Sequence, residues 1–115
     1  MADPFILKRG DTWVCPHTLE QPDGAPVDLA GCTVRCQVRD KKTEALLADV
    51  SDYLSVTPAD GRVDFSVPAS VTVEWPVGRY RYDLQVTGAD GVVTTYPRTT
   101  SLDLSVIRDE TQPND

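Results

Sequence analysis

Three Asp-Gly pairs divide this chain, at positions 23–24, 60–61 and 90–91, and each is followed closely by a stretch with β-strand character. Glycine accepts a positive φ angle and an aspartate side chain can hydrogen-bond its own backbone, so Asp-Gly is typical of chain reversals. A chain that reverses this often, between short segments that suit strands, is expected to be all-β.

The strand predictions rest on the alternation of apolar and polar side chains, which is the pattern of an extended chain with one buried face. The clearest strand is 79–87, where the apolar face is formed by Tyr80, Tyr82, Leu84 and Val86. Further clear strands are predicted at 33–39, 62–67 and 101–108, and weaker ones at 5–8, 12–15, 53–57 and 92–96.

Helical signal is thin. Residues 42–50 are short and isolated, and suit either a helix or a strand with a loop, while residues 68–73 suit one helical turn that starts at a proline. The prediction is therefore an immunoglobulin-like antiparallel β-sandwich of about seven strands, with at most one or two short helical turns. A small barrel is the competing architecture.

The length and charge of the chain limit the classes of partner. A chain of 115 residues suits a single domain, 1–115, with a core at about 5–108 and a loose acidic tail at 109–115. The formal net charge of −7 argues against binding to nucleic acid or to an anionic membrane surface. No signal peptide or long apolar run is visible, which favours a protein made and first used in a cytoplasm.

The sequence contains one histidine, His17, and any Cys-His or Ser-His-Asp catalytic group would have to use it. Pro16 separates it from Cys15 and is expected to disturb the geometry of a Cys-His pair, so no catalytic residue is predicted. Zinc ligands of the right type are present, but the spacing of Cys15, His17, Cys32 and Cys36 does not match a zinc finger or knuckle. No metal and no other cofactor is predicted.

The cysteines are interpreted as small core residues. Cys32 and Cys36 lie four positions apart in one predicted strand, which is too far for a disulfide bond, although Cys15 could meet one of them across strands. The carboxylates of Asp23, Asp60 and Asp90 are interpreted as turn residues first, and as calcium ligands only if the loops converge.

Three segments carry a resemblance to a known family. Residues 8–12 read Lys-Arg-Gly-Asp-Thr, residues 23–34 follow the pattern DG-x-PVDL-x-G-x-TV, and residues 78–84 follow G-x-Y-x-Y-x-L. In this order, over about 5–106, they resemble the immunoglobulin-like N-terminal domain of siphophage upper baseplate proteins and related small phage tail-associated structural proteins.

The resemblance implies a non-enzymatic structural protein of a bacteriophage virion. Such a protein would be a small module of the tail, baseplate or capsid surface, assembled in the host bacterial cytoplasm. Its partners would be other virion structural proteins, bound through protein–protein contacts in multiple copies or as a homo-oligomer.

Two surfaces are predicted to bind such a partner. The first is the short apolar strand formed by Phe5, Ile6 and Leu7, because a terminal strand can add to the sheet edge of a neighbour. The second is a docking patch for an acidic neighbour, which forms if the last strands pair, and its residues are Arg79, Arg81 and Arg98.

The alternative function is a carbohydrate-binding or adhesin-type β-sandwich module. Such a module would expose Trp75 and Tyr96 on one cluster of loops, where their rings could stack against sugars.

Overall fold

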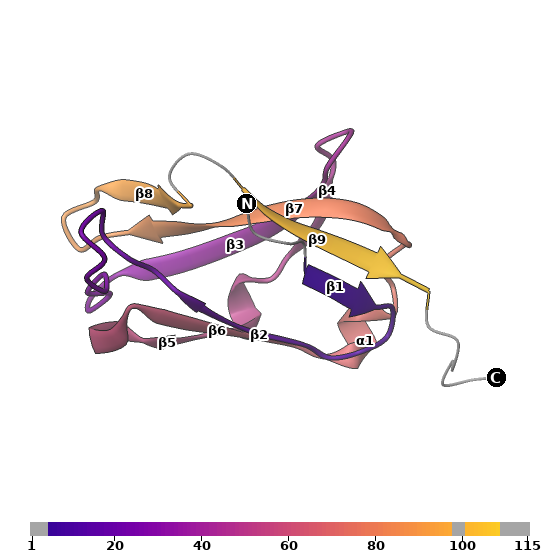
Figure 1. Ribbon diagram of the computed structural model, residues 1–115, viewed down its shortest axis with the longest axis horizontal. Helices are drawn as coiled ribbons and strands as arrows, with labels where there is room; N and C mark the ends of the chain where they lie inside the picture. The colour runs from indigo at the N-terminus through magenta and orange to yellow at the C-terminus, as the bar shows by residue number, and fades with distance from the viewer. Residues whose placement is uncertain (1–4, 98–100, 109–115) are drawn as a thin grey trace.

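Two β-sheets account for most of the computed structural model, which describes residues 5–97 and 101–108 (Figure 1). The described strands are β1 (Phe5–Lys8), β2 (Trp13–Thr18), β3 (Thr33–Asp40), β4 (Leu46–Asp49), β5 (Leu54–Thr57), β6 (Arg62–Val67), β7 (Gly78–Thr87), β8 (Val93–Tyr96) and β9 (Leu102–Ile107). The helical elements are η1 (Ser51–Tyr53), η2 (Pro58–Asp60) and α1 (Ala69–Thr72). No helix in these described ranges is long and apolar enough to cross a membrane.

The larger sheet has six strands in the order β1-β9-β7-β3-β4, and β8 pairs with β7. The long strand β7 has room for two partners on one side, because β9 pairs with residues 78–82 and β8 with residues 84–87. The pairs are antiparallel, except that β1 runs parallel to β9.

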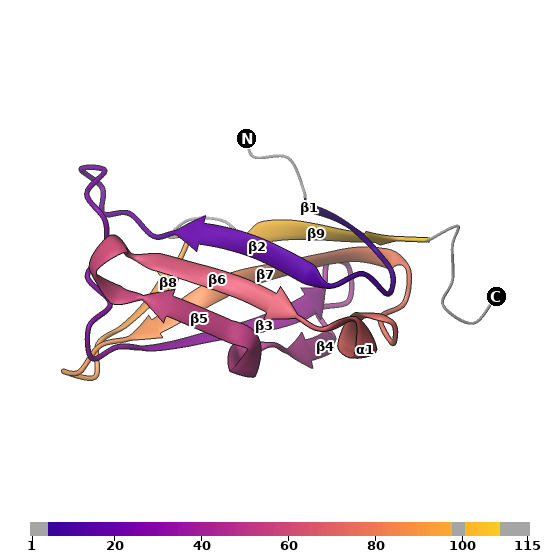
Figure 2. The same cartoon turned by 90° about the horizontal axis from the view of Figure 1, so that it is seen from below.

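The smaller sheet has the order β2-β6-β5 and is antiparallel throughout. It covers the larger sheet, as Figure 2 shows from its own side. These two layers confirm the predicted immunoglobulin-like antiparallel sandwich, with nine strands in the described residues rather than about seven.

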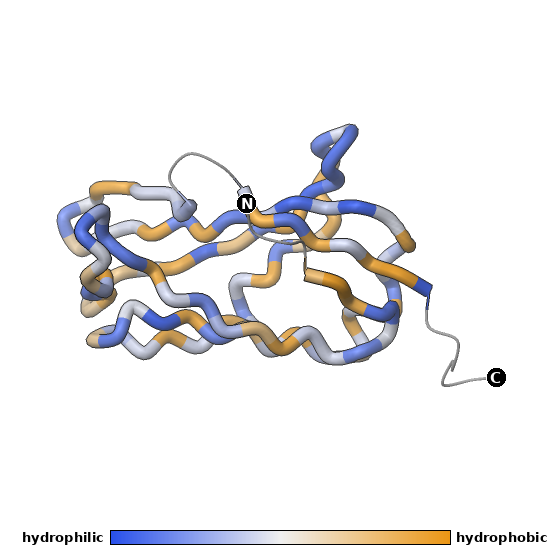
Figure 3. Tube along the Cα trace, in the orientation of Figure 1, coloured by the Kyte–Doolittle hydropathy of each residue, from blue (hydrophilic) through white to orange (hydrophobic). Residues whose placement is uncertain are grey.

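Alternation along the strands places the core between the two sheets, and Figure 3 shows apolar and polar positions taking turns along them. The four predicted inward residues of β7, from Tyr80 to Val86, are at most 5% exposed. The intervening polar residues of β7 keep contact with solvent. The predicted facing of this strand is therefore confirmed.

Trp13 on β2 lies at the centre of the core and is fully buried. Its ring centroid lies 5.0 Å from that of Phe65, 5.1 Å from that of Tyr82 and 6.0 Å from that of Trp75. Tilted and edge-on contacts at these separations are favourable, because the positive edge of one ring meets the negative face of another. This aromatic cluster joins the two sheets, since Tyr82 belongs to the larger sheet and Phe65 to the smaller.

Two of the Asp-Gly pairs form turns through the aspartate side chain. The Asp23 carboxylate accepts a hydrogen bond from the Ala25 N–H, and the Asp90 carboxylate accepts one from the Val92 N–H, both at 3.0 Å. Each bond bridges two positions, as in the turn that aspartate forms with its own backbone. These contacts confirm both aspartates as turn residues.

The third pair, Asp60-Gly61, is the connection between η2 and β6, and here the glycine is required. Gly61 has a φ angle of 62°, and a Cβ atom at this position would lie 2.7 Å from the carbonyl oxygen of Leu19. The Gly61 carbonyl also accepts a hydrogen bond of 2.7 Å from the Leu19 N–H. The turn at Gly61 therefore packs directly against the end of β2. It fixes the position of Leu19, where the loop after β2 begins.

Pro16 does not end its strand, although the predicted strand covers only 12–15, because β2 continues to Thr18. The strand lies at an edge of the smaller sheet, with β6 as its partner. The Leu19 N–H bonds on the β6 side, so alternation along β2 leaves position 16 on the free edge. A proline is tolerated there, since its missing N–H would have faced no partner.

The two ambiguous segments are also resolved. Residues 42–50 form a loop followed by β4 rather than a helix, and the Asp40 carboxylate holds that loop by accepting hydrogen bonds from the N–H groups of Lys42 and Thr43. The expected helical turn is present as α1, with Pro68 directly before it. Proline suits this place because the first helical turn has no intrahelical acceptor for its N–H groups.

Candidate functional site

A hollow with a mainly apolar lining lies where the end of β2 and the loop after it face β7, β8 and the start of β9. Its volume is about 430 Å³. The apolar part of the lining consists of Leu19, Pro22, Leu84, Pro97 and Leu102. The polar part consists of His17, Thr18, Glu20, Gln21 and Tyr96. We call this hollow the β2–β8 pocket.

A cluster of three polar side chains lies beside the β2–β8 pocket and inside the sandwich. Cys15 and His17 come from the same face of β2, because residues two apart in a strand point to the same side. The Cys15 Sγ lies 3.5 Å from the His17 Nε2, and the Tyr82 hydroxyl, from β7 of the other sheet, lies 3.0 Å from the same nitrogen. We call these residues the Cys15–His17–Tyr82 cluster.

Burial keeps the Cys15–His17–Tyr82 cluster uncharged near neutral pH. The pKa of His17 is lowered by burial, and the pKa of the Cys15 thiol is raised by burial. The pKa of Tyr82 is raised well above its ordinary value, first by burial and then by the neighbouring Cys15 and Cys36. Neutral imidazole has one donor and one acceptor nitrogen. In one tautomer of His17 the Tyr82 O–H and the Cys15 S–H compete for the lone pair on Nε2, and in the other the Nε2–H donates to one of these two partners.

The comparisons with known proteins give a fold and no family. No family model matches the chain, and no curated protein matches it. Among solved structures, the crystal structure of CopC from Methylosinus trichosporium OB3b is similar, with a TM-score of 0.55 and 14% sequence identity. The match covers 96% of this chain and 90% of that chain. At this identity the likeness shows the fold alone.

This finding corrects the function expected from the sequence. The similar solved structure is a CopC and not a phage protein, and nothing in these comparisons supports a phage, virion, tail or baseplate role. The motifs behind that expectation mark turns and strand starts, which unrelated sandwiches share. The assignment as a bacteriophage virion structural protein is therefore wrong.

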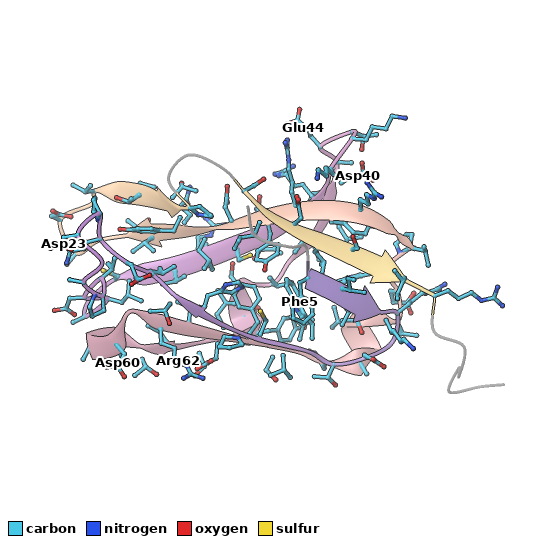
Figure 4. The ribbon with its side chains drawn as sticks, viewed as in Figure 1. Phe5, Asp23, Asp40, Glu44, Asp60 and Arg62 are labelled. Carbon is cyan, nitrogen blue, oxygen red and sulfur yellow. The ribbon has the colours of Figure 1, made fainter. Side chains whose placement is uncertain are left out.

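The predicted partner strand is part of the larger sheet. Phe5–Lys8 forms β1, which is paired with β9, and Leu7 is only 4% exposed. The Phe5 ring contacts Trp13 at a centroid distance of 6.1 Å, and Figure 4 shows its side chain on the inner side of β1. Ile6 alone of the three is largely exposed, at 62%.

The structure describes two of the three residues of the predicted arginine patch. Arg81 forms an ion pair with Glu44, which projects from the loop between β3 and β4 in Figure 4. Arg79 is exposed on the same strand, and its carbonyl accepts a hydrogen bond from the Lys41 N–H. Arg98 lies outside the described residues. Arg79 and Arg81 share the outward face of β7, and their proximity to Arg98 stays a prediction.

The four residues of zinc-ligand type, whose spacing did not predict a zinc site, separate into two groups. Cys15 and His17 meet in the cluster, whereas Cys36 is buried on β3 and Cys32 precedes that strand. All three cysteines are free thiols. In residues 5–97 and 101–108, no three side chains of His, Cys, Asp or Glu lie close enough together to hold a metal ion.

The two aromatic residues expected in a carbohydrate platform also separate. Trp75 is 3% exposed and belongs to the core, so it cannot stack against a sugar. Tyr96 is half-buried and lines the β2–β8 pocket. The predicted pair of exposed aromatic residues is therefore wrong for Trp75.

Sequence reasoning missed the contact between His17 and Tyr82 and the pocket beside it. The Cys-x-His spacing was the available signal, because it places both side chains on one face of a strand. The assumption that Pro16 would break that strand concealed it. Tyr82 could not have been found in the same way, since it lies 65 positions away on the other sheet.

Proposed function

We propose that this protein is a binding module that holds a small, mainly apolar ligand in the β2–β8 pocket. The observation that carries the proposal is an apolar hollow of about 430 Å³ with a half-buried histidine at its side. Small-molecule sites have this character, with an apolar lining and a few polar groups that fix orientation. Their volumes are usually about 300–1,000 Å³, which includes this one.

Binding is a better account of the Cys15–His17–Tyr82 cluster than catalysis. A nucleophilic cysteine needs a lowered pKa, which a cationic neighbour or a helix N-terminus usually provides. Here burial raises the pKa of the Cys15 thiol and lowers that of His17, so the thiolate–imidazolium pair is disfavoured. The neutral His17 ring is suited to hydrogen bonding with a ligand instead.

The charge around the β2–β8 pocket favours a neutral or cationic ligand over an anionic one. Glu20 is the one carboxylate among its described lining residues, and no lysine or arginine joins it there. The whole chain carries a formal net charge of −7, which adds to the repulsion of anions.

A matched pair of fluorescent probes tests both the site and its charge preference. N-phenylnaphthylamine is neutral, and anilinonaphthalene sulfonate has the same rings with an added negative charge. We expect the neutral probe to bind more tightly. We also expect Glu20→Gln to reduce the difference in affinity between the two probes, because it removes the carboxylate that repels the anionic one. Equal affinity of the two probes in both proteins would contradict the charge preference.

The location is tested by removing apolar surface from the β2–β8 pocket. Leu102→Ser should weaken binding of N-phenylnaphthylamine by about fivefold, since burial of a leucine side chain against the probe is lost. The control is Leu46→Ser, because Leu46 is also a strand leucine, is 50% exposed, and does not line the pocket. Circular dichroism establishes that both variants are folded. Equal loss in both variants, or none in Leu102→Ser, would overturn the proposal.

A further inference from the structure

We propose that the ligand of the β2–β8 pocket is a neutral molecule with a carbonyl oxygen, and that this oxygen accepts a hydrogen bond from the Nδ1–H of His17. The inference rests on the proposed function, because it concerns the ligand of the same pocket. The observation behind it is that the two ring nitrogens of His17 have different surroundings. Nε2 has protein partners inside the sandwich, whereas Nδ1 has none among the described residues.

The Tyr82 hydroxyl decides which ring nitrogen carries the proton. Tyr82 is 3% exposed, its hydroxyl oxygen lies 3.0 Å from Nε2 of His17, and it forms no other hydrogen bond within the described residues. Buried hydroxyl groups are hydrogen-bonded, because an unpaired donor loses its bonds to water without replacement. The Tyr82 O–H therefore donates to the lone pair of Nε2. In a neutral imidazole this places the proton on Nδ1.

Cys15 does not need the same lone pair. Its Sγ lies 3.9 Å from the carbonyl oxygen of Pro16 as well as 3.5 Å from Nε2 of His17. A thiol is a weak donor, and the Pro16 carbonyl gives it an acceptor of its own. The His17 ring is neutral near pH 7 because burial lowers its pKa. The tautomer with the proton on Nδ1 therefore provides an acceptor for both donors.

Nδ1 of His17 remains open to a ligand. In the described residues, the one buried side-chain nitrogen or oxygen without a partner is the Nε1 of Trp13. Nδ1 also lacks a partner there, so it is not buried and keeps contact with solvent. His17 is half-buried and lines the β2–β8 pocket. A molecule that fills the pocket therefore comes within reach of the Nδ1–H and displaces solvent from it.

The rest of the lining determines which acceptor suits this N–H. A ligand without an acceptor would leave the N–H unpaired against apolar surface, and sites with a fixed hydrogen-bonding group discriminate against such ligands. A carboxylate is disfavoured by Glu20 in the lining and by the net charge of −7. A hydroxyl would bring a donor of its own that needs a further partner. A carbonyl on an apolar body pairs with the N–H and adds no donor.

Nitrogen NMR tests the position of the proton without any ligand. His17 is the only histidine of the chain, so labelling with nitrogen-15 histidine gives one pair of ring signals. We expect Nδ1 to resonate as an N–H nitrogen and Nε2 as a nitrogen without hydrogen. The difference should diminish in Tyr82→Phe and persist in Tyr80→Phe, because the buried Tyr80 hydroxyl donates instead to the Pro76 carbonyl at 2.7 Å. A proton on Nε2 in the unmodified protein would overturn the proposal.

A pair of fluorescent ligands tests the preference for a carbonyl. The first is Prodan, an aromatic ketone, and the second is its deoxy analogue, in which a methylene group replaces the carbonyl. We expect the ratio of their affinities, ketone over analogue, to fall roughly five- to tenfold in His17→Phe combined with Tyr82→Phe. This double change removes both partners of one hydrogen bond and keeps ring-shaped side chains, and circular dichroism checks that it folds. The ratio should be unchanged in Tyr80→Phe.

The emission of Prodan reports the hydrogen bond directly, because it moves to longer wavelength when the carbonyl accepts one. Emission of the bound probe should therefore shift to shorter wavelength in the double variant. Binding of both probes with an unchanged ratio in that variant would overturn this inference and leave the proposed function standing. Failure of both probes to bind the unmodified protein would overturn the proposed function as well. The nitrogen NMR measurement keeps the test decisive if the double variant is unfolded.

Discussion

The environment of His17 is set by one neighbour on its own strand, Cys15, and one on the opposite sheet, Tyr82. The sequence predicts that Cys15 and His17 share a face of β2 if the strand continues, and the structure confirms that it continues. The third partner, Tyr82, could be predicted to point inward on its own strand, but its contact with His17 depends on how the two sheets are stacked. Alternation within a strand carries no information about that stacking.

The lowered pKa of His17 predicts a dependence of stability on pH. The ordinary pKa of histidine is 6.5 and the folded value lies below it, so between these values the unfolded chain binds more protons than the folded one. The free energy of unfolding is therefore greatest above about pH 6.5 and should fall as the pH decreases through the folded pKa. Urea unfolding between about pH 5 and 7.5 measures this slope.

His17→Gln is the control for this prediction, because the chain has no other histidine. The variant should lose most of the slope in that pH range. The lowered pKa values of Asp40 and Asp49 act only below their ordinary value of 3.8 and do not interfere. An unchanged slope in His17→Gln would contradict the assignment of the pH dependence of stability to His17.

At the scale of elements, β1 shows where strand prediction succeeds and where it stops. Its bounds, Phe5–Lys8, were predicted from an apolar run, and the structure confirms them. Its partner could not be predicted, because the parallel ladder with β9 joins segments almost 100 positions apart in the chain. Because the sequence does not reveal β9 as the partner of β1, a strand that is buried at Leu7 was interpreted as an arm free to bind a neighbour.

The packing of β1 can be tested with a pair of adjacent substitutions. Leu7→Ala should lower the free energy of unfolding by about 2–5 kcal/mol, as large-to-small changes in a core do. Ile6→Ala, one position earlier and facing solvent, should change it by no more than about 0.5 kcal/mol. Chemical denaturation measures both. Equal effects would show that β1 is not held against the core in the way described.

At the scale of the whole molecule, the sequence predicted the all-β sandwich and misassigned its function. The fold class follows from periodicity and turn chemistry, which act locally and can be inferred from any stretch of the chain. The β2–β8 pocket depends on how far β2 extends and on its position opposite β7, β8 and β9, which only the assembled structure shows. Motifs that mark turns were consequently poor guides to partners.

The charge of the whole molecule predicts its response to salt. The ion pairs of the described residues all keep at least 36% of each side chain exposed, so each contributes little to stability. The excess of negative charge acts over the entire surface, and salt screens it. We expect the melting temperature to rise on the order of 1–3 °C between about 0.05 and 0.5 M NaCl.

A variant with lower net charge separates this effect from general effects of salt. Glu20→Gln combined with Glu74→Gln removes two exposed carboxylates that form no ion pair within the described residues. The melting temperature of this double variant should therefore rise less with salt. Calorimetry measures both proteins. A melting temperature that falls with salt would show that the surface pairs dominate instead.

The parallel ladder between β1 and β9 gives the sandwich a direction of mechanical strength. Its register runs from Phe5 opposite Leu104 to Lys8 opposite Ile107, so a pull applied before Phe5 and after Ile107 slides the two strands along each other. Sliding loads every hydrogen bond of the ladder at once, whereas a pull across the end of a hairpin opens them one after another. Tension applied at the two ends of the described core therefore loads the β1–β9 ladder in shear, which is the direction in which paired strands resist separation most strongly.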